Sequence, residues 1–270
     1  MKKERRVSFF LFFVLAGVLS NSGARADTFF GEAPTGFLQL DNFRYPVYLL
    51  VPQTYDASRP YPLILALPDE KDSPEAYAKE WADWAKKKGY LVLVPTLKLR
   101  LEDVPYGTDE WLLNLKKEIT GRYNITPDRI YLIGEGSSAH YAAYLGVNYP
   151  AEFSAVGLVE GSWPGPLEKL LRLSSRPIKQ NPFFVAISEN SADLLKTTEA
   201  KAYQLTKKGY PVYLERIAGP SGELSPELRD QILEWLEKKA NSWLLVIKES
   251  ERSWKEKFFV GVEEFFIPSQ

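Results

Sequence analysis

Continuous apolar runs of strand length recur along this chain, and each is followed by a segment with helical periodicity. The runs at 62–68 and 90–95 are apolar throughout, which is typical of strands that are covered on both faces. Runs of this kind alternate with amphipathic segments of about 10–15 residues, and that order predicts βαβ units. We therefore expect an α/β fold with a mostly parallel central sheet and helices on both faces.

Capping signals place several helix ends. Ser73 is suited to an N-cap, Pro74 to the first helical position, and Gly89 to the residue that ends the same helix. Periodicity predicts the other elements. We expect further helices at 109–123, 137–148, 194–208 and 226–240, and strands within 37–52 and at 129–133, 155–159, 183–187 and 212–216.

The first 26 residues form a segment of their own. A basic stretch at 2–6 precedes an apolar run from Val7 to Leu19, and Ala24-Arg25-Ala26 provides a small-residue end. This order is that of a bacterial-type secretory signal peptide. An uncleaved anchor is the alternative, but the run is shorter than the roughly 20 apolar residues of a membrane-spanning helix. We expect cleavage after Ala26, export to the periplasm or medium, and no stable membrane insertion of the mature chain.

The remaining chain divides into a domain at 27–240 and a C-terminal extension at 241–270. Within the extension, 244–247 and 258–262 are apolar and could be two added strands separated by a charged turn. The segment either packs back on its own domain or, because it is rich in aromatic residues, forms a docking or edge-pairing surface for a protein partner.

Charge and cysteine content exclude several functions. The net charge is −1 for the whole chain and becomes more negative without the basic signal. No basic stripe is present, so we expect no nucleic-acid partner. The absence of cysteine excludes disulfides and thiolate chemistry, and a single histidine leaves no zinc-type spacing. We expect no metal and no cofactor, and we interpret the acidic residues at 69–75 as a solvated loop and helix start rather than a calcium site.

One strand–turn–helix segment carries a family resemblance. Residues 128–134 read DRIYLIG, and after a turn and a helix residues 149–156 read YPAEFSAV. This segment resembles the secreted esterase branch of the α/β-hydrolases, which includes feruloyl esterases, polyhydroxyalkanoate depolymerases and acetyl esterases. The resemblance covers roughly 37–240. It implies the α/β-hydrolase fold and positions for a serine nucleophile, a histidine base and an acid.

The nucleophile and the base of that family are replaced here. The family motif G-x-S-x-G corresponds to residues 134–138, GEGSS, which puts Gly136 at the nucleophile position. The family run G-H-E-L corresponds to 221–224, SGEL, which puts Gly222 at the histidine position. Glycine can neither attack a carbonyl carbon nor accept a proton from a hydroxyl. The resemblance therefore implies that acyl transfer by the usual route is lost.

The acid and the oxyanion loop also depart from the family pattern. The turn that carries the acid corresponds to 188–193, where Ser191 takes the acid position and Asp193 is a second candidate, or else the N-cap of the next helix. The oxyanion loop, often H-G in the family, reads Pro68-Asp69. A carboxylate at Asp69 would oppose the negative charge that develops during acyl transfer.

These replacements favour a non-catalytic, exported binding or scaffold protein whose partner is an unknown small molecule or protein. We expect the pocket of such a protein to be lined by Pro68, Asp69, Glu135, Gly136, Ser137 and Trp163. An exposed Trp163 would suit a sugar ring or an aromatic acid, and a packed loop tryptophan is the alternative.

Two other functions stay open. One is a serine esterase with a shifted nucleophile, in which Ser137 or Ser138 works with His140. His140 lies three positions beyond Ser137, so the two side chains share a helix face. The other is an interaction protein that acts through the aromatic extension at 241–270.

Overall fold

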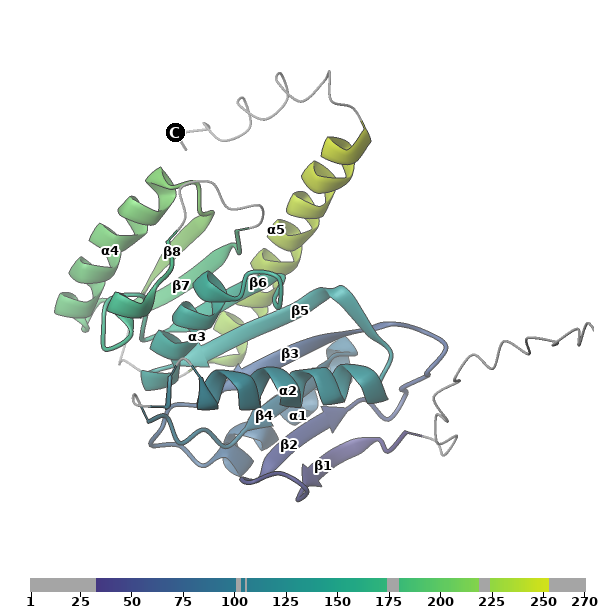
Figure 1. Ribbon diagram of the computed structural model, residues 1–270. Coiled ribbons are helices and arrows are strands. Elements are labelled where there is room, and N and C mark those ends of the chain that lie inside the picture. The colour runs from purple at the N-terminus through teal and green to yellow at the C-terminus, as the bar shows by residue number, and fades with distance from the viewer. Residues whose placement is uncertain (1–32, 101–102, 105, 174–179, 219–223, 253–270) are drawn as a thin grey trace, which may run out of the picture. The chain divides into compact units, whose positions relative to one another are not determined.

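Eight strands of the described chain form one sheet, in the order β1-β2-β4-β3-β5-β6-β7-β8 (Figure 1). The computed structural model describes residues 33–100, 103–104, 106–173, 180–218 and 224–252, with the backbone alone from 241. All of them belong to one compact unit, Ala33–Gln270. The strands are β1 (Gly36–Leu40), β2 (Val47–Val51), β3 (Tyr61–Leu67), β4 (Leu91–Pro95), β5 (Ile125–Glu135), β6 (Ala155–Val159), β7 (Phe183–Ser188) and β8 (Val212–Ile217).

Most of the sheet is parallel. β2 pairs antiparallel with both β1 and β4, and every other neighbouring pair is parallel. All residues of β3 and β4 are buried, as the continuous apolar runs predict for strands with both faces covered. The predicted fold class, a mostly parallel sheet with helices on both faces, is confirmed.

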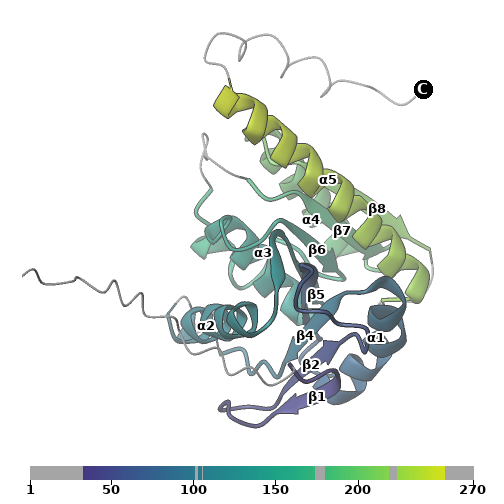
Figure 2. The ribbon, with the colours of Figure 1, turned by 90° about the vertical axis from the view of Figure 1, so that its right-hand side faces the viewer.

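Helices cover the sheet on two sides (Figures 1 and 2). Buried side chains of α2 (Gly107–Arg122), α3 (Ser137–Asn148) and α4 (Ala192–Lys207) pack in one hydrophobic core. Those of α1 (Pro74–Lys88) and α5 (Pro226–Arg252) pack in the other. A short 3-10 helix, η2, spans Glu168–Leu170. Each core thus forms one layer between the sheet and its helices.

Helix α1 begins and ends as its sequence predicts. Ser73 is the N-cap, and its side chain accepts a hydrogen bond from the Ala76 N–H. Pro74 occupies the first turn, where a missing N–H costs nothing. Gly89 ends the helix in the left-handed conformation, with φ of +74°, which glycine adopts without a steric penalty.

The last helix is longer than the sequence analysis expects. Helix α5 runs without a break to Arg252, so the predicted strand at 244–247 is wrong, and the chain continues helically across the boundary placed at residue 240. Apolar residues at 236, 240, 243, 244 and 247 follow helical spacing, and no glycine or proline interrupts 227–252. The second predicted strand, 258–262, and the signal segment 1–26 lie outside the described residues.

The parallel strands place their following loops at one edge of the sheet. The loops that begin at Pro68, Thr96, Gly136, Glu160 and Glu189 come after the carboxyl ends of β3, β4, β5, β6 and β7. Ligand sites of open α/β sheets lie at this edge. We therefore expect a functional site at this edge. No helix within the described residues has the length and apolar character needed to cross a membrane.

Candidate functional site

A single residue, Gly136, connects strand β5 to helix α3. Its φ of +53° and ψ of −123° place it in a region that glycine adopts without a steric penalty. The Gly136 N–H donates a hydrogen bond of 2.9 Å to the carbonyl of Val159 at the end of β6. The chain therefore makes the sharp strand-to-helix turn that a nucleophile elbow requires, with glycine at its tip.

Neighbouring glycines allow this turn to pack closely. A Cβ at Gly134 would lie 2.7 Å from both the Ala142 Cβ and the Ser138 carbonyl oxygen. A Cβ at Gly161 would lie 2.5 Å from the carbonyl oxygen of Gly136. The first turn of α3 is thus pressed against β5 and the loop after β6, and larger residues at these two positions would move the elbow.

The carboxylate of Asp69 occupies the space in which a side chain at position 136 would lie. A Cβ built on Gly136 would be 2.3 Å from Asp69 Oδ2. Asp69 is fixed there by three groups: Ser137 Oγ donates to Oδ1 at 2.8 Å, the Ser137 N–H donates at 3.3 Å, and Lys71 Nζ lies 3.2 Å from Oδ2. The loop after β3 therefore places a carboxylate where a side chain at position 136 would lie.

The hydrogen bonds around Asp69 keep it ionised. Partial burial by itself would raise its pKa, but the hydrogen bonds from Ser137 and Lys71 outweigh burial and hold the pKa below its ordinary value. An ionised Asp69 accepts hydrogen bonds and cannot donate one to a developing oxyanion. A low pKa also makes it a weak base toward the Ser137 hydroxyl.

The three residues of the shifted-nucleophile alternative form hydrogen bonds to other groups or are buried. Ser137 Oγ donates to Asp69 and accepts from the Glu70 N–H at 3.1 Å. Ser138 is only 3% exposed. His140 Nδ1 instead lies 2.6 Å from the Ser162 carbonyl oxygen. Among the described residues, no hydrogen bond joins His140 to Ser137 or Ser138.

A carboxylate from the loop after β6, that of Glu160, reaches the predicted acid position. Ser191 Oγ donates to Glu160 Oε2 at 2.8 Å, and the Ser188 N–H donates to Oε1 at 2.5 Å. Glu160 has a φ of +52°, the one positive value at a non-glycine position in the described chain. Such strain occurs where surrounding contacts over-determine the backbone. Sequence reasoning missed Glu160, because a single acid after an apolar strand carries no signal.

Asp193, the second acid candidate, lies away from these contacts. Helix α4 begins at Ala192 with Ser191 as its N-cap, so Asp193 belongs to the first helical turn and is exposed. The predicted N-cap role of Asp193 is therefore wrong, because the helix starts earlier than residue 194. Gly222, the predicted histidine position, lies outside the described residues.

Two residues expected to line the pocket are buried elsewhere. Trp163 is 2% exposed and packs edge-on against Phe183, with 5.1 Å between ring centroids. The prediction that it lines the pocket is therefore wrong, and it is the packed loop tryptophan of the alternative. Glu135 is also buried, and the Tyr77 hydroxyl of α1 donates a hydrogen bond to it. Burial raises the pKa of Glu135 to about 7.

Two hollows open at the carboxyl edge of the sheet. The larger, of about 400 Å³, has Pro68, Asp69, Glu70, Asp72 and Pro74 on one side and residues 96–100 on the other. The smaller, of about 170 Å³, shares residues 96–98 and Arg100 with it and continues to Arg44, Tyr45, Asp103, Gly107, Thr108 and Trp111. The shared residues make the two hollows neighbours, and Asp69 connects the larger one to the elbow.

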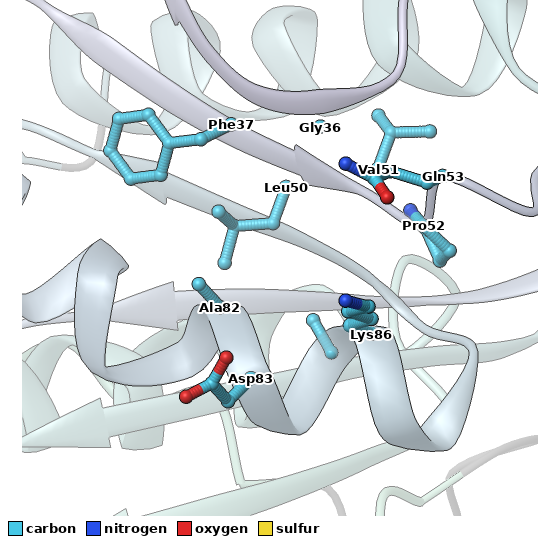
Figure 3. Close-up of a pocket in the computed structure, with 10 residues that line it drawn as sticks. Gly36, Phe37, Leu50, Val51, Pro52, Gln53, Ala82, Asp83 and Lys86 are labelled. Carbon is cyan, nitrogen blue, oxygen red and sulfur yellow. The ribbon is translucent and has the colours of Figure 1, made fainter.

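A third hollow lies at the opposite edge. Figure 3 shows this hollow between the strands and helix α1, at the start of β1 and the end of β2. Leu50 and Val51 lie on the strand side, and Ala82 and Lys86 lie on the helix. Leu50 pairs with Val92, near the start of β4. This hollow is therefore remote from the elbow. Within the described residues, no group of three or more histidine, aspartate or glutamate residues is placed to hold a metal ion.

Comparisons with known proteins identify the fold. No family model and no curated protein sequence matches the chain. An S-formylglutathione hydrolase from Staphylococcus aureus matches with a TM-score of 0.57 and 10% identity, over 78% of this chain and 100% of that one. An acetyl xylan esterase from Aspergillus awamori matches with a TM-score of 0.58 and 9% identity, over 75% and 99%. A thermostable esterase matches with a TM-score of 0.52 and 21% identity, over 77% and 62%.

These matches show that the chain has the α/β-hydrolase fold of known esterases, as the resemblance of residues 128–156 predicts. At such identities they establish the architecture alone, because one fold serves many functions. The elbow and the hollows of this chain therefore carry the evidence for its function.

The overlap between position 136 and Asp69 can be measured as a coupling energy. Gly136→Ala should lower the free energy of unfolding by about 2 kcal/mol, because the new Cβ meets the carboxylate and strains a positive-φ residue. In an Asp69→Ala background the same substitution should cost about 1 kcal/mol less. Asp69→Asn, which preserves the volume of the side chain, is the matched control. If Gly136→Ala costs the same in the wild type, in Asp69→Ala and in Asp69→Asn, the two side chains do not overlap.

Proposed function

We propose that this chain is an exported binding protein that uses an α/β-hydrolase fold without hydrolysing esters. The observation that carries the proposal is the carboxylate of Asp69, which lies 2.3 Å from where the Cβ of a nucleophile at position 136 would be. Glycine at 136 supplies no attacking group, and an ionised Asp69 would repel the oxyanion of a tetrahedral intermediate.

The remaining groups at the elbow support the same conclusion. Ser137 Oγ is engaged by Asp69 and by the Glu70 N–H, and His140 is directed to the Ser162 carbonyl. A serine hydroxyl at its ordinary pKa needs a neighbouring base. The sequence offers glycine at the family's histidine position, 222. Loss of nucleophile and base together leaves no pair of groups for acyl transfer.

The export part of the proposal rests on the segment 1–26 and its A-x-A end. N-terminal sequencing of the processed protein would test it, and a first residue other than Asp27 would contradict the predicted cleavage site. The binding part rests on the larger hollow, which Asp69 connects to the elbow, and on its smaller neighbour, both at the edge where α/β proteins hold their ligands.

Hydrolysis of short- and medium-chain nitrophenyl esters tests the absence of catalysis. We expect the purified protein to release nitrophenol no faster than the heat-denatured protein, and Ser137→Ala, Ser138→Ala and His140→Ala to leave that rate unchanged. Turnover by the wild type that one of these substitutions abolishes would establish a shifted nucleophile and reject the proposal. The three variants also serve as controls for a contaminating esterase, whose activity would not follow the substitutions.

A further inference from the structure

The smaller hollow at the carboxyl edge gathers cations around aromatic rings. Lys98 Nζ and Arg44 Cζ each lie 5.3 Å from the centroid of the Tyr45 ring. Trp111 of α2 meets the same ring edge-on, with 6.5 Å between centroids. Both aromatic residues are half-buried, whereas Arg44 and Lys98 are exposed. The lining of this hollow therefore combines two half-buried aromatic rings with two exposed cationic groups.

Two of the cations that line this hollow have no carboxylate partner among the described residues. Arg100 pairs with Asp103 at 3.7 Å, but within the described part of the chain neither Arg44 nor Lys98 forms a salt bridge. Arg44 and Lys98 both line this hollow, and like charges that share a hollow repel each other, so an anion bound in the hollow would reduce that repulsion. The smaller hollow is therefore suited to an anionic group attached to a ring.

The larger hollow has the opposite character on one wall. Glu70 and Asp72 are exposed there beside Asp69. Carboxylates accept hydrogen bonds and donate none, so this wall suits a ligand portion that is uncharged and rich in hydroxyl donors. The two hollows share residues 96–98, so one extended ligand can occupy both.

We propose that the two hollows bind an acidic oligosaccharide that carries one uronic acid residue. The carboxylate of the uronic acid lies at Arg44 and Lys98, and its ring packs against Tyr45 and Trp111. The hydroxyl groups of the neighbouring neutral sugar donate to the wall of Glu70 and Asp72. This inference rests on the proposed function as a binding protein and names the class of its ligand.

Isothermal titration calorimetry at low ionic strength tests the proposal with cellobiouronic acid and cellobiose. The two disaccharides differ in one carboxylate, so we expect cellobiose to bind at least about tenfold more weakly, the equivalent of one charge-assisted hydrogen bond. A third probe, 4-hydroxybenzoate, carries a carboxylate and a ring without sugar hydroxyls. We expect it to bind more weakly than cellobiouronic acid, because it cannot reach the acidic wall.

Substitutions on the surface separate the two hollows. Lys98→Gln and Arg44→Gln should each weaken cellobiouronic acid binding by about threefold to tenfold. Lys86→Gln, in the hollow at the opposite edge, is the matched control and should leave the affinity unchanged. All three side chains are exposed, so we expect folded variants, which circular dichroism verifies.

Several results would overturn the ligand class. They are equal binding of cellobiose, binding of 4-hydroxybenzoate as tight as that of cellobiouronic acid, insensitivity to Lys98→Gln and Arg44→Gln, or no heat from any probe. None of these results bears on ester hydrolysis. Conversely, turnover of nitrophenyl esters would reject the non-catalytic function while leaving the calorimetric result to stand by itself.

Discussion

Replacement of Asp109 by alanine should lower the free energy of unfolding by about 3–5 kcal/mol, because it breaks a buried, charged hydrogen-bond network. Asp109 is 1% exposed. Its Oδ1 accepts from the Tyr141 hydroxyl, and its Oδ2 accepts from the hydroxyls of Tyr144 and Tyr149, each at 2.7 Å. The substitution would leave three hydroxyl groups without their acceptor where α2 meets α3.

Denaturant unfolding of the two proteins measures this effect, and Glu110 provides the matched control. Glu110 is the next acid in the first turn of α2 but is exposed, so Glu110→Ala should change stability by less than about 0.5 kcal/mol. Tyr144→Phe should cost less than Asp109→Ala, because it removes one donor and leaves two. A loss below about 1 kcal/mol for Asp109→Ala would show that the network does not hold α2 and α3 together.

Glu135→Gln should stabilise the protein at alkaline pH and not at acid pH. Burial raises the pKa of Glu135 from 4.5 to about 7, although the hydrogen bond from Tyr77 and the charge of Arg229 oppose the rise. Asp72 and Glu80 add smaller upward contributions. Above pH 7 the folded protein holds a buried charge that the unfolded chain exposes to water, and this weakens folding.

The direction of the pH dependence follows from the raised pKa. Protonated Glu135 stabilises the folded state relative to ionised Glu135. This contribution is fully present below about pH 4.5 and is lost as the pH rises through about 7. The two pKa values differ by an amount equivalent to about 3 kcal/mol. Glutamine keeps the acceptor for Tyr77 and carries no charge, so Glu135→Gln should gain about 1–3 kcal/mol over the wild type at pH 8.

Urea unfolding at pH 4.5, 6 and 8 measures this difference, with Glu110→Gln as the exposed control. The advantage of Glu135→Gln should shrink steadily as the pH falls and vanish near pH 4.5. If Glu135→Gln is more stable than the wild type by the same amount at all three pH values, the charge of Glu135 is not the cause of the difference. A loss of stability at pH 8 would mean that Arg229 compensates the buried carboxylate fully.

Most of the fold could be predicted from the sequence because its signals are strong and local. The apolar runs at 62–68 and 90–95 and the caps at Ser73 and Gly89 each depend on a few neighbouring residues. The prediction fails at 244–247, where a short apolar run is compatible with either a strand or a helix. There the chain continues α5, because nothing in the sequence ends that helix.

The candidate site was harder to predict because its contacts are distant in sequence. The resemblance places Asp69 in the oxyanion loop, but its contact with the space at Gly136 joins segments more than sixty residues apart. Glu160 reaches Ser191 across the ends of two strands. The position of Trp163 depends on strand β7, because its ring packs against Phe183 of that strand. Such contacts depend on strand order and register, which local patterns do not specify.

Labelling with a fluorophosphonate tests most directly whether any serine at the elbow is nucleophilic. The reagent phosphonylates activated serine hydroxyls whatever acyl group the enzyme prefers, so it does not depend on the choice of substrate. We predict that the intact mass of the protein stays unchanged under conditions that label a known serine esterase completely. A stoichiometric adduct mapped to Ser137 or Ser138 by peptide mass spectrometry would contradict a non-catalytic elbow.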